Sequence, residues 1–199
     1  MKLSDIADII PGTILSRVKT TNSFEKTRSL PLAVMQDISY YSGSNLNVAP
    51  ETAKAEILIS KQPQCVFTKE GGLLYGLTQF RSIVVTKELS GRLVPSNLVI
   101  LKIRNKTIDP WYLMWVLNEG PCSKDNIFPR IQGQGIVKLL SVANLRELEV
   151  PAPPPKAKQE EVGGLYRLLL EKKRIQKQID DSENILIQEA LKKMNGGNE

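Results

Sequence analysis

Pro151-Ala-Pro-Pro-Pro155 is followed by a proline-free run over residues 156–194, KAKQEEVGGLYRLLLEKKRIQKQIDDSENILIQEALKKM, and these two stretches decide the fold of the chain. Four prolines in five residues favour an extended backbone and exclude a helix or a central strand. In the run that follows, apolar side chains recur at steps of three and four residues, which indicates one amphipathic helix. The sequence therefore predicts two parts, a domain over residues 1–155 and a long helix over residues 156–195.

The predicted helix is too long to pack along its whole length on a domain of this size. At ~1.5 Å per residue it would extend for ~60 Å, and its apolar stripe is interrupted at Lys172 and at Ser182 and Glu183. The stripe therefore needs a partner, either another helix or another chain. We expect five apolar side chains of the stripe to be buried against that partner: Leu165, Leu169, Ile175, Ile179 and Leu186.

Short helices and strands are predicted before the proline-rich boundary. Two helix starts carry capping residues, Asp109 before Pro110 and Ser141 before a short apolar segment. The expected helices cover residues 3–10, 111–118 and 142–146. Runs of apolar and β-branched residues predict strands over residues 32–38, 57–59, 65–68, 81–86 and 98–103. The fold class is therefore α+β, a mixed β-rich domain followed by one long C-terminal helix.

The composition excludes several classes of enzyme. None of the 199 residues is histidine and two are cysteine, which removes serine–histidine and cysteine–histidine nucleophiles and ordinary zinc sites. The sequence holds neither the GxxxxGK[ST] phosphate loop nor the GxGxxG dinucleotide motif. Carboxylate chemistry remains possible on composition alone. No apolar run approaches the ~20 residues of a membrane span, so we expect a cytoplasmic protein without a metal or a cofactor.

The charge of the chain is +6 and is unevenly distributed. There are 27 Lys and Arg residues against 21 Asp and Glu residues, and residues 156–199 hold nine of the former and eight of the latter. Residues 1–155 therefore carry 18 basic and 13 acidic side chains, a difference of +5. A basic domain beside a nearly neutral helix is typical of a protein that binds a polyanion such as DNA. A soluble basic protein with no such partner is the competing interpretation.

Three polar segments of the domain are candidates for DNA contacts. They cover residues 39–45, 71–81 and 130–134, and they hold Arg, Gln and Asn side chains of the kind that pair with base edges. The competing interpretation is that these are ordinary polar surface loops whose aromatic residues cover the core. The side chains expected to face a duplex are Tyr40, Tyr41, Asn45, Thr78, Gln79, Arg81, Arg130, Gln132 and Gln134, with Lys102, Arg104 and Lys106 on phosphates.

Five segments in order resemble one half of the specificity (S) subunit of type I restriction–modification enzymes. They are LSDIADIIPG (3–12), CVFTKEGG (65–72), GRLVPSNLVI (91–100), IDPWYLMWVL (108–117) and VPAPPPKAKQ (150–159). The last of these resembles the exit of the family's recognition domain, a proline-rich run with a Gln shortly before a long helix. Each segment alone is unspecific, and the ordered series carries the resemblance.

The resemblance implies a non-catalytic target recognition domain that reads double-stranded DNA, and a long spacer helix. S subunits carry two such domains and two antiparallel helices, whereas this chain has one of each. We therefore expect a homodimer through a coiled coil, which reads a bipartite site and docks methylation (M) and restriction (R) subunits. An alternative is an assembly or decoy protein that pairs with full-length S subunits through its helix. A nuclease with an unrecognised carboxylate site is a further alternative.

Overall fold

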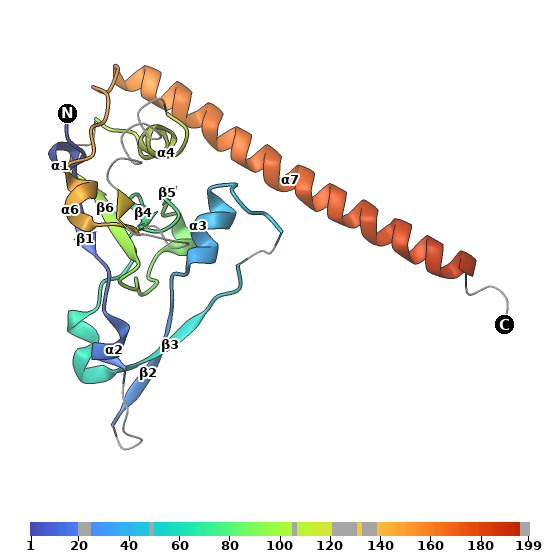
Figure 1. Ribbon diagram of the computed structural model, residues 1–199, viewed down its shortest axis with the longest axis horizontal. Coiled ribbons are helices and arrows are strands. Elements are labelled where there is room, and N and C mark those ends of the chain that lie inside the picture. The colour runs from blue at the N-terminus through green and yellow to red at the C-terminus, as the bar shows by residue number, and fades with distance from the viewer. Residues whose placement is uncertain (20–24, 48–49, 105–106, 121–130, 133–138, 196–199) are drawn as a thin grey trace.

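The computed structural model describes residues 1–19, 25–47, 50–104, 107–120, 131–132 and 139–195. A rounded domain is continued at one end by a long helix that projects away from it, and at the other end by a narrow two-stranded arm (Figure 1). The α+β prediction is confirmed, and the long helix runs from Lys156 to Asn195.

The helices, in chain order, are α1 (Leu3–Ile6), α2 (Leu15–Val18), α3 (Met35–Tyr41), η1 (Ile59–Gln64), η2 (Lys87–Leu89), α4 (Pro110–Asn118), α6 (Val142–Arg146) and α7 (Lys156–Asn195). The strands are β1 (Ala7–Pro11), β2 (Thr27–Pro31), β3 (Lys54–Leu58), β4 (Leu73–Gly76), β5 (Arg81–Val84), β6 (Leu98–Ile103), β7 (Ile131–Gln132) and β8 (Leu139–Leu140).

A four-stranded antiparallel sheet forms the centre of the domain. Its strand order is β1-β6-β4-β5, with Leu74 of β4 opposite Ile100 on one side and Ile83 on the other. Every residue of β4 is buried, which is why the strand is a continuous apolar run without alternation. The main core lies between this sheet and α1, α3, α4, α6 and the first part of α7.

The arm is a separate antiparallel pair, β2 with β3, which has a small core of its own. Ile57 is fully buried there, together with Leu30 and Ala55, against Val18 of α2 and Leu93. The alternate residues Lys54 and Glu56 point outward. This second core holds the arm in place on the domain.

Several local predictions are confirmed by hydrogen bonds. The strand over 98–103 is β6, and the helix after Pro110 is α4, with the Asp109 carboxylate accepting from the Tyr112 N–H at 2.8 Å. The Ser141 hydroxyl caps α6 by accepting from the Asn144 N–H at 3.1 Å.

Three local predictions are wrong. The helix expected over 3–10 ends at Ile6, because the following residues pair with β6 and form the edge strand β1. The strand expected over 32–38 does not form: Leu32 makes only an isolated bridge to Leu93, and α3 begins at Met35. The carboxylate of Asp37 accepts from the Val34 N–H at 2.8 Å and fixes this helix start. Residues 65–68 contribute an isolated bridge from Phe67 to Leu93 in place of a strand.

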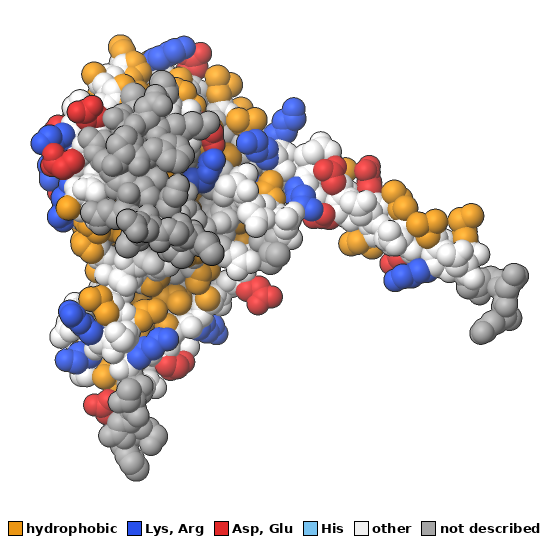
Figure 2. All heavy atoms as spheres, viewed as in Figure 1, with side chains coloured by type: hydrophobic (Ala, Val, Ile, Leu, Met, Phe, Trp, Pro, Cys, Tyr) orange, Lys and Arg blue, Asp and Glu red, His pale blue; other side chains and the backbone are white. Residues whose placement is uncertain are grey.

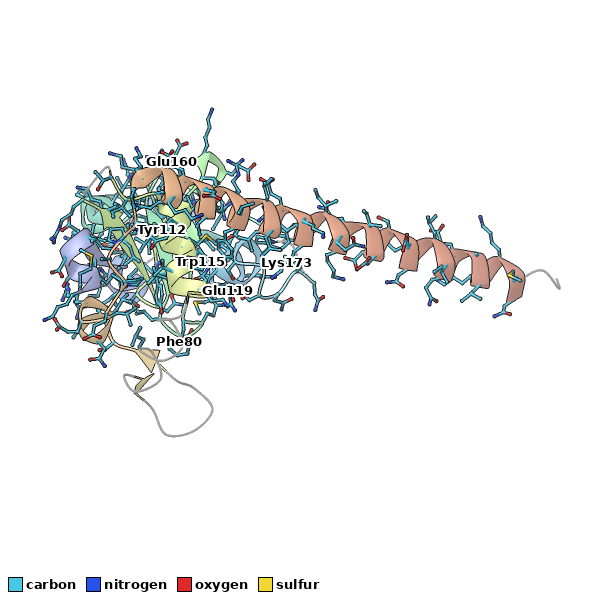
Figure 3. All side chains as sticks on the ribbon, turned by 90° about the horizontal axis from the view of Figure 1, so that it is seen from above. Phe80, Tyr112, Trp115, Glu119, Glu160 and Lys173 are labelled. Carbon is cyan, nitrogen blue, oxygen red and sulfur yellow. The ribbon has the colours of Figure 1, made fainter. Side chains whose placement is uncertain are left out.

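The first part of α7 is fixed against α4. The side chain of Gln159, only 2% exposed, accepts from the Asp109 N–H at 3.0 Å and donates to the carbonyls of Thr107 at 3.1 Å and Pro154 at 2.8 Å. Tyr166 and Leu170 are buried on the same side of the helix. Figure 3 shows α7 lying across α4 before it leaves the domain near Lys173. The direction of α7 is therefore set by specific contacts with α4.

Gly163 and Gly164 provide a matched test of this contact. A Cβ on Gly163 would lie 2.8 Å from the Tyr112 nitrogen and 2.9 Å from the Trp111 Cβ, whereas one on Gly164 would meet nothing within 4 Å. We expect Gly163→Ala to destabilise the protein by about 1–2 kcal/mol, because overpacking outweighs the gain of ~1 kcal/mol in helix propensity. Gly164→Ala should instead stabilise it by up to about 1 kcal/mol. Urea unfolding of the two variants measures the difference, and equal effects would show that α7 does not need this close approach.

Candidate nucleic-acid interface

The exposed face of α7 carries the five apolar side chains predicted to need a partner. In the single chain Leu165 is 63% exposed, Ile175 57% and Leu186 65%. Leu169 and Ile179 are less exposed, at 46% and 45%. Further exposed apolar residues follow towards the end of the helix, and Figure 2 shows them along its projecting part. An exposed stripe of this length on one helix is typical of an interaction surface.

Gln79 and Thr78, both expected to face DNA, are directed towards α3. The amide of Gln79 donates to the Met35 carbonyl at 2.8 Å and to the Ser39 hydroxyl at 2.6 Å. The Thr78 hydroxyl lies 3.9 Å from the Met35 sulfur. These bonds hold α3 on the turn between β4 and β5. The amide nitrogen of Gln79 therefore has two acceptors within the domain, and its contact with a base stays a prediction.

Arg81, Tyr40 and Tyr41 also have partners within the chain. The Arg81 guanidinium forms an ion pair with Glu119 at 2.7 Å. Tyr40 and Tyr41 pack edge to face, and the Arg174 guanidinium lies over the Tyr41 ring at 5.9 Å. Partial burial raises the pKa of the Tyr41 hydroxyl above its usual range. This pair of tyrosines therefore lies against α7, on the side of the helix that meets the domain.

The remaining predicted residues divide into those with described side chains and those without. Lys102 is exposed on β6, and Arg104 beyond it pairs with Asp8 at 2.6 Å and donates to the Ser4 carbonyl at 3.0 Å. The Asn45 side chain accepts from the Asn47 N–H at 3.0 Å in an exposed turn. Lys106, Arg130, Gln134 and the side chain of Gln132 lie outside the described residues.

A basic surface that the sequence did not predict lies on the arm. We call it the basic arm; it comprises β2 and β3 with the adjoining α2 and η1, and it carries Arg17, Lys19, Lys26, Arg28, Lys54 and Lys61. Five of these six side chains are exposed and Lys61 is half-buried, and within the described part of the chain none of them forms an ion pair. Figure 2 shows this concentration of Lys and Arg around the arm.

The charge of the basic arm contrasts with that of the predicted residues. Three acidic residues, Glu25, Glu51 and Glu56, accompany the six basic ones, which leaves a difference of +3. Arg81 and Arg104, by comparison, are each neutralised by a carboxylate. A two-stranded ribbon is also one of the two elements that fit the major groove of B-DNA. The signal in the sequence was the excess of basic residues over 17–28, where Glu25 is the one acidic residue.

The described residues hold neither a metal site nor a membrane span. They contain no group of three or more Cys, Asp or Glu side chains arranged to hold a metal ion. None of the described helices is long and apolar enough to cross a membrane.

The chain therefore has one recognisable architecture, a sheet-centred domain with a protruding two-stranded arm, followed by a long helix with an exposed apolar face. The sequence matches no family model and no curated protein. Its structure, however, is similar to that of the HsdS subunit from Thermoanaerobacter tengcongensis, with a TM-score of 0.54 and 14% identity over 97% of this chain.

Two further solved structures show the same similarity. A chain of a type I R-M system aligns over 98% of this chain with a TM-score of 0.59 and 14% identity. The S subunit of the type I restriction–modification system from M. genitalium aligns over 96% with a TM-score of 0.50 and 14% identity. The alignments cover 48%, 48% and 43% of those chains, so this chain spans about half their length. The chain therefore has the S-subunit fold that the sequence resemblance predicted.

Proposed function

We propose that this chain is a DNA sequence-specificity subunit of a type I restriction–modification system. The observation that carries the proposal is that a fold shared with S subunits presents an arm of basic side chains that form no ion pair with the carboxylates of the described residues. Lys and Arg residues that are not neutralised within the protein are available to DNA phosphates, which supply most of the affinity of such complexes. The ribbon β2–β3 enters or follows a groove of the DNA duplex. Lys102 adds a phosphate contact from β6.

The two parts of the chain have different roles in this proposal. Residues 1–155 bind DNA, and residues 156–195 hold two copies together through the exposed stripe of α7. A two-fold pair reads a symmetric, bipartite site, because each copy contributes one recognition domain. The pair also docks the M subunit and an R subunit, which carry the methylation and cleavage chemistry, so the chain itself is non-catalytic. The segment 130–134 remains a proposed base-reading loop.

The basic arm supplies the first test of this function. We expect Lys26→Ala/Arg28→Ala/Lys54→Ala to weaken binding to a fluorescein-labelled duplex of mixed sequence by roughly ten- to a hundredfold at low salt. Each copy loses three phosphate contacts, so a dimer that binds with both arms loses six. The slope of log K against log salt should therefore fall by about 5, since each contact contributes ~0.9. Fluorescence anisotropy at several salt concentrations measures both quantities.

A matched control removes the same charge elsewhere. Lys69, Lys87 and Lys192 are exposed outside the basic arm, so Lys69→Ala/Lys87→Ala/Lys192→Ala lowers the net charge equally. It should leave the salt slope nearly unchanged. If both triple variants lose the same affinity and slope, binding depends on overall charge and the arm is not the interface. If neither wild type nor variants bind DNA, the assembly or decoy alternative, which requires α7 alone, replaces the proposal.

A further inference from the structure

We propose that the exposed face of α7 specifies a single antiparallel register with α7 of a second copy, in which Ile175 lies opposite Ile179 and Lys172 lies opposite Ser182. The inference rests on the pairing of two copies in the proposed function and goes beyond it, because it fixes which residues meet. It is carried by the positions, exposure and charges of side chains along the helix.

The residues that form this contact lie on the side of α7 away from the domain. Tyr166 and Leu170 point to α4 and are buried, whereas Ile175 and Ile179 lie about half a turn around the helix from them and are exposed. Steps of three and four residues connect the positions on that side. We call this set the seam: Leu168, Lys172, Ile175, Ile179, Ser182 and Leu186.

The two polar residues of the seam match each other in only one antiparallel arrangement. Placing Ile175 of one helix opposite Ile179 of its partner also brings Leu168 opposite Leu186, and Lys172 opposite Ser182 with Glu183 adjacent. All apolar seam residues then meet apolar residues, and both interruptions of the stripe coincide. A polar residue within a seam is a known determinant of register, because any other alignment buries it against apolar side chains.

Shifting the register by seven residues in either direction removes this match. One shift puts Lys172 opposite Ile175, so that an ammonium group faces an apolar side chain. The other puts Ile179 opposite Ser182, so that a hydroxyl group faces an apolar side chain at two places in the dimer. A parallel pair in register would place Lys172 of one helix beside Lys172 of the other. The self-complementary alignment is therefore favoured over each of its neighbours.

The charges of α7 support the antiparallel direction independently of the seam. Residues 167–177 hold five basic side chains and one acidic, a difference of +4, whereas residues 180–189 hold four acidic side chains and no basic one. In the proposed register residues 167–177 of one helix lie opposite residues 177–187 of the other, so the basic block meets most of the acidic block. A parallel pair would align like charges, which opposes association.

The register also determines how far apart the two domains lie. It places Asn195 of one helix beside Gln159 of the other, the residue that ties α7 to its domain. The two Gln159 anchors are then separated by 36 residues of helix, or ~54 Å at ~1.5 Å per residue. The match between Lys172 and Ser182 therefore fixes the distance between the two DNA-binding domains.

Disulfide trapping in mixed dimers tests the register. In a Cys65→Ser/Cys122→Ser background, an affinity-tagged chain with Lys172→Cys is mixed with an untagged chain carrying Ser182→Cys, Ile175→Cys or Glu189→Cys. Mild oxidation should cross-link Lys172→Cys to Ser182→Cys with a yield several-fold above the other two pairs, since a disulfide needs Cα atoms within ~7 Å. A dominant cross-link to position 175 or 189 would overturn the proposed register, and self-linking of Lys172→Cys would indicate a parallel pair.

Two further measurements separate this inference from the proposed function. Light scattering shows whether two copies pair at all, and a monomer at high concentration would refute both pairing and register while leaving DNA binding by the domain unaffected. The variant Lys172→Leu/Ser182→Leu removes both interruptions of the stripe, so other alignments should become populated. Leu168→Cys should then cross-link to Leu186→Cys with a lower yield than in chains that keep Lys172 and Ser182. An unchanged yield would show that the polar pair does not set the register.

Discussion

Replacing Arg92 with leucine is expected to destabilise the protein by about 3–5 kcal/mol at neutral pH, because it leaves a buried carboxylate without its partner. Arg92 donates to Asp37 at 2.9 Å, and the Asp37 side chain is only 1% exposed. The two residues join α3 to the segment after η2, 55 positions apart in sequence. Urea unfolding at neutral pH measures the loss, and a change within about 1 kcal/mol would show that the pair contributes little.

A double variant and a change of pH separate the buried charge from lost packing. Asp37→Asn/Arg92→Leu removes both charges while an amide oxygen can still accept from Val34, so it should be more stable than Arg92→Leu alone. Burial already raises the pKa of Asp37, with Arg92 opposing the rise, so removing Arg92 raises it further. When the folded-state pKa lies above the ordinary ~3.9, folding takes up a proton at pH values between the two. The deficit of Arg92→Leu should therefore shrink as the pH falls from neutral towards the ordinary pKa of an aspartate, because the folded variant takes up its proton before the unfolded chain does.

Elements that depend on neighbouring residues could be predicted from the sequence, and those that depend on distant partners could not. The start of α4 follows from Asp109 and Pro110, and α7 follows from its uninterrupted periodicity. The strand predicted over 32–38 failed because Asp37 caps a helix and is held by Arg92, a contact that local apolar patterns do not reveal. The apolar residues of segment 32–38 fit a buried helix face as well as they fit a strand.

In the candidate site, too, the partners of single side chains could not be predicted from neighbouring residues. Gln79 and Arg81 are polar residues near a turn, and the sequence cannot show that Met35 and Glu119 are their partners. The basic arm was missed for the opposite reason, since its residues come from segments over 17–28 and 54–61 that only the pairing of β2 with β3 brings together. Gly163 depends on a distant partner in the same way, because its lack of a side chain allows the close approach of α7 to Trp111 and Tyr112 of α4.

The largest effect on association is expected from Ile175→Asp/Ile179→Asp. In a paired α7 this variant would bury four carboxylates per dimer in the seam, and each would have to be desolvated or protonated. We expect the dissociation constant to rise by at least about a thousandfold, or ~4 kcal/mol. Sedimentation velocity over a range of concentrations should show a dimer for the unmodified chain and a monomer for the variant.

The matched control places the same charges on the opposite face of the same helix. Asn184 and Gln188 are exposed and lie away from the seam, so Asn184→Asp/Gln188→Asp should leave the dimer intact. If the seam variant remains a dimer, or if both variants dissociate equally, the seam is not the contact.

The seam variant also separates the contribution of pairing to DNA binding from that of the basic arm. A monomer brings one arm to the duplex where a dimer brings two, so its salt slope should fall to about half that of the unmodified protein. Losing the second attachment should weaken binding to a two-site duplex by roughly a hundredfold or more, although no residue of either arm has changed. The variant Lys26→Ala/Arg28→Ala/Lys54→Ala, by contrast, should remain a dimer. Its slope of log K against log salt should be smaller because phosphate contacts are missing. Only a dimeric DNA-reading subunit is expected to show both patterns, because a decoy that pairs through α7 would lose partners in the first variant and nothing in the second.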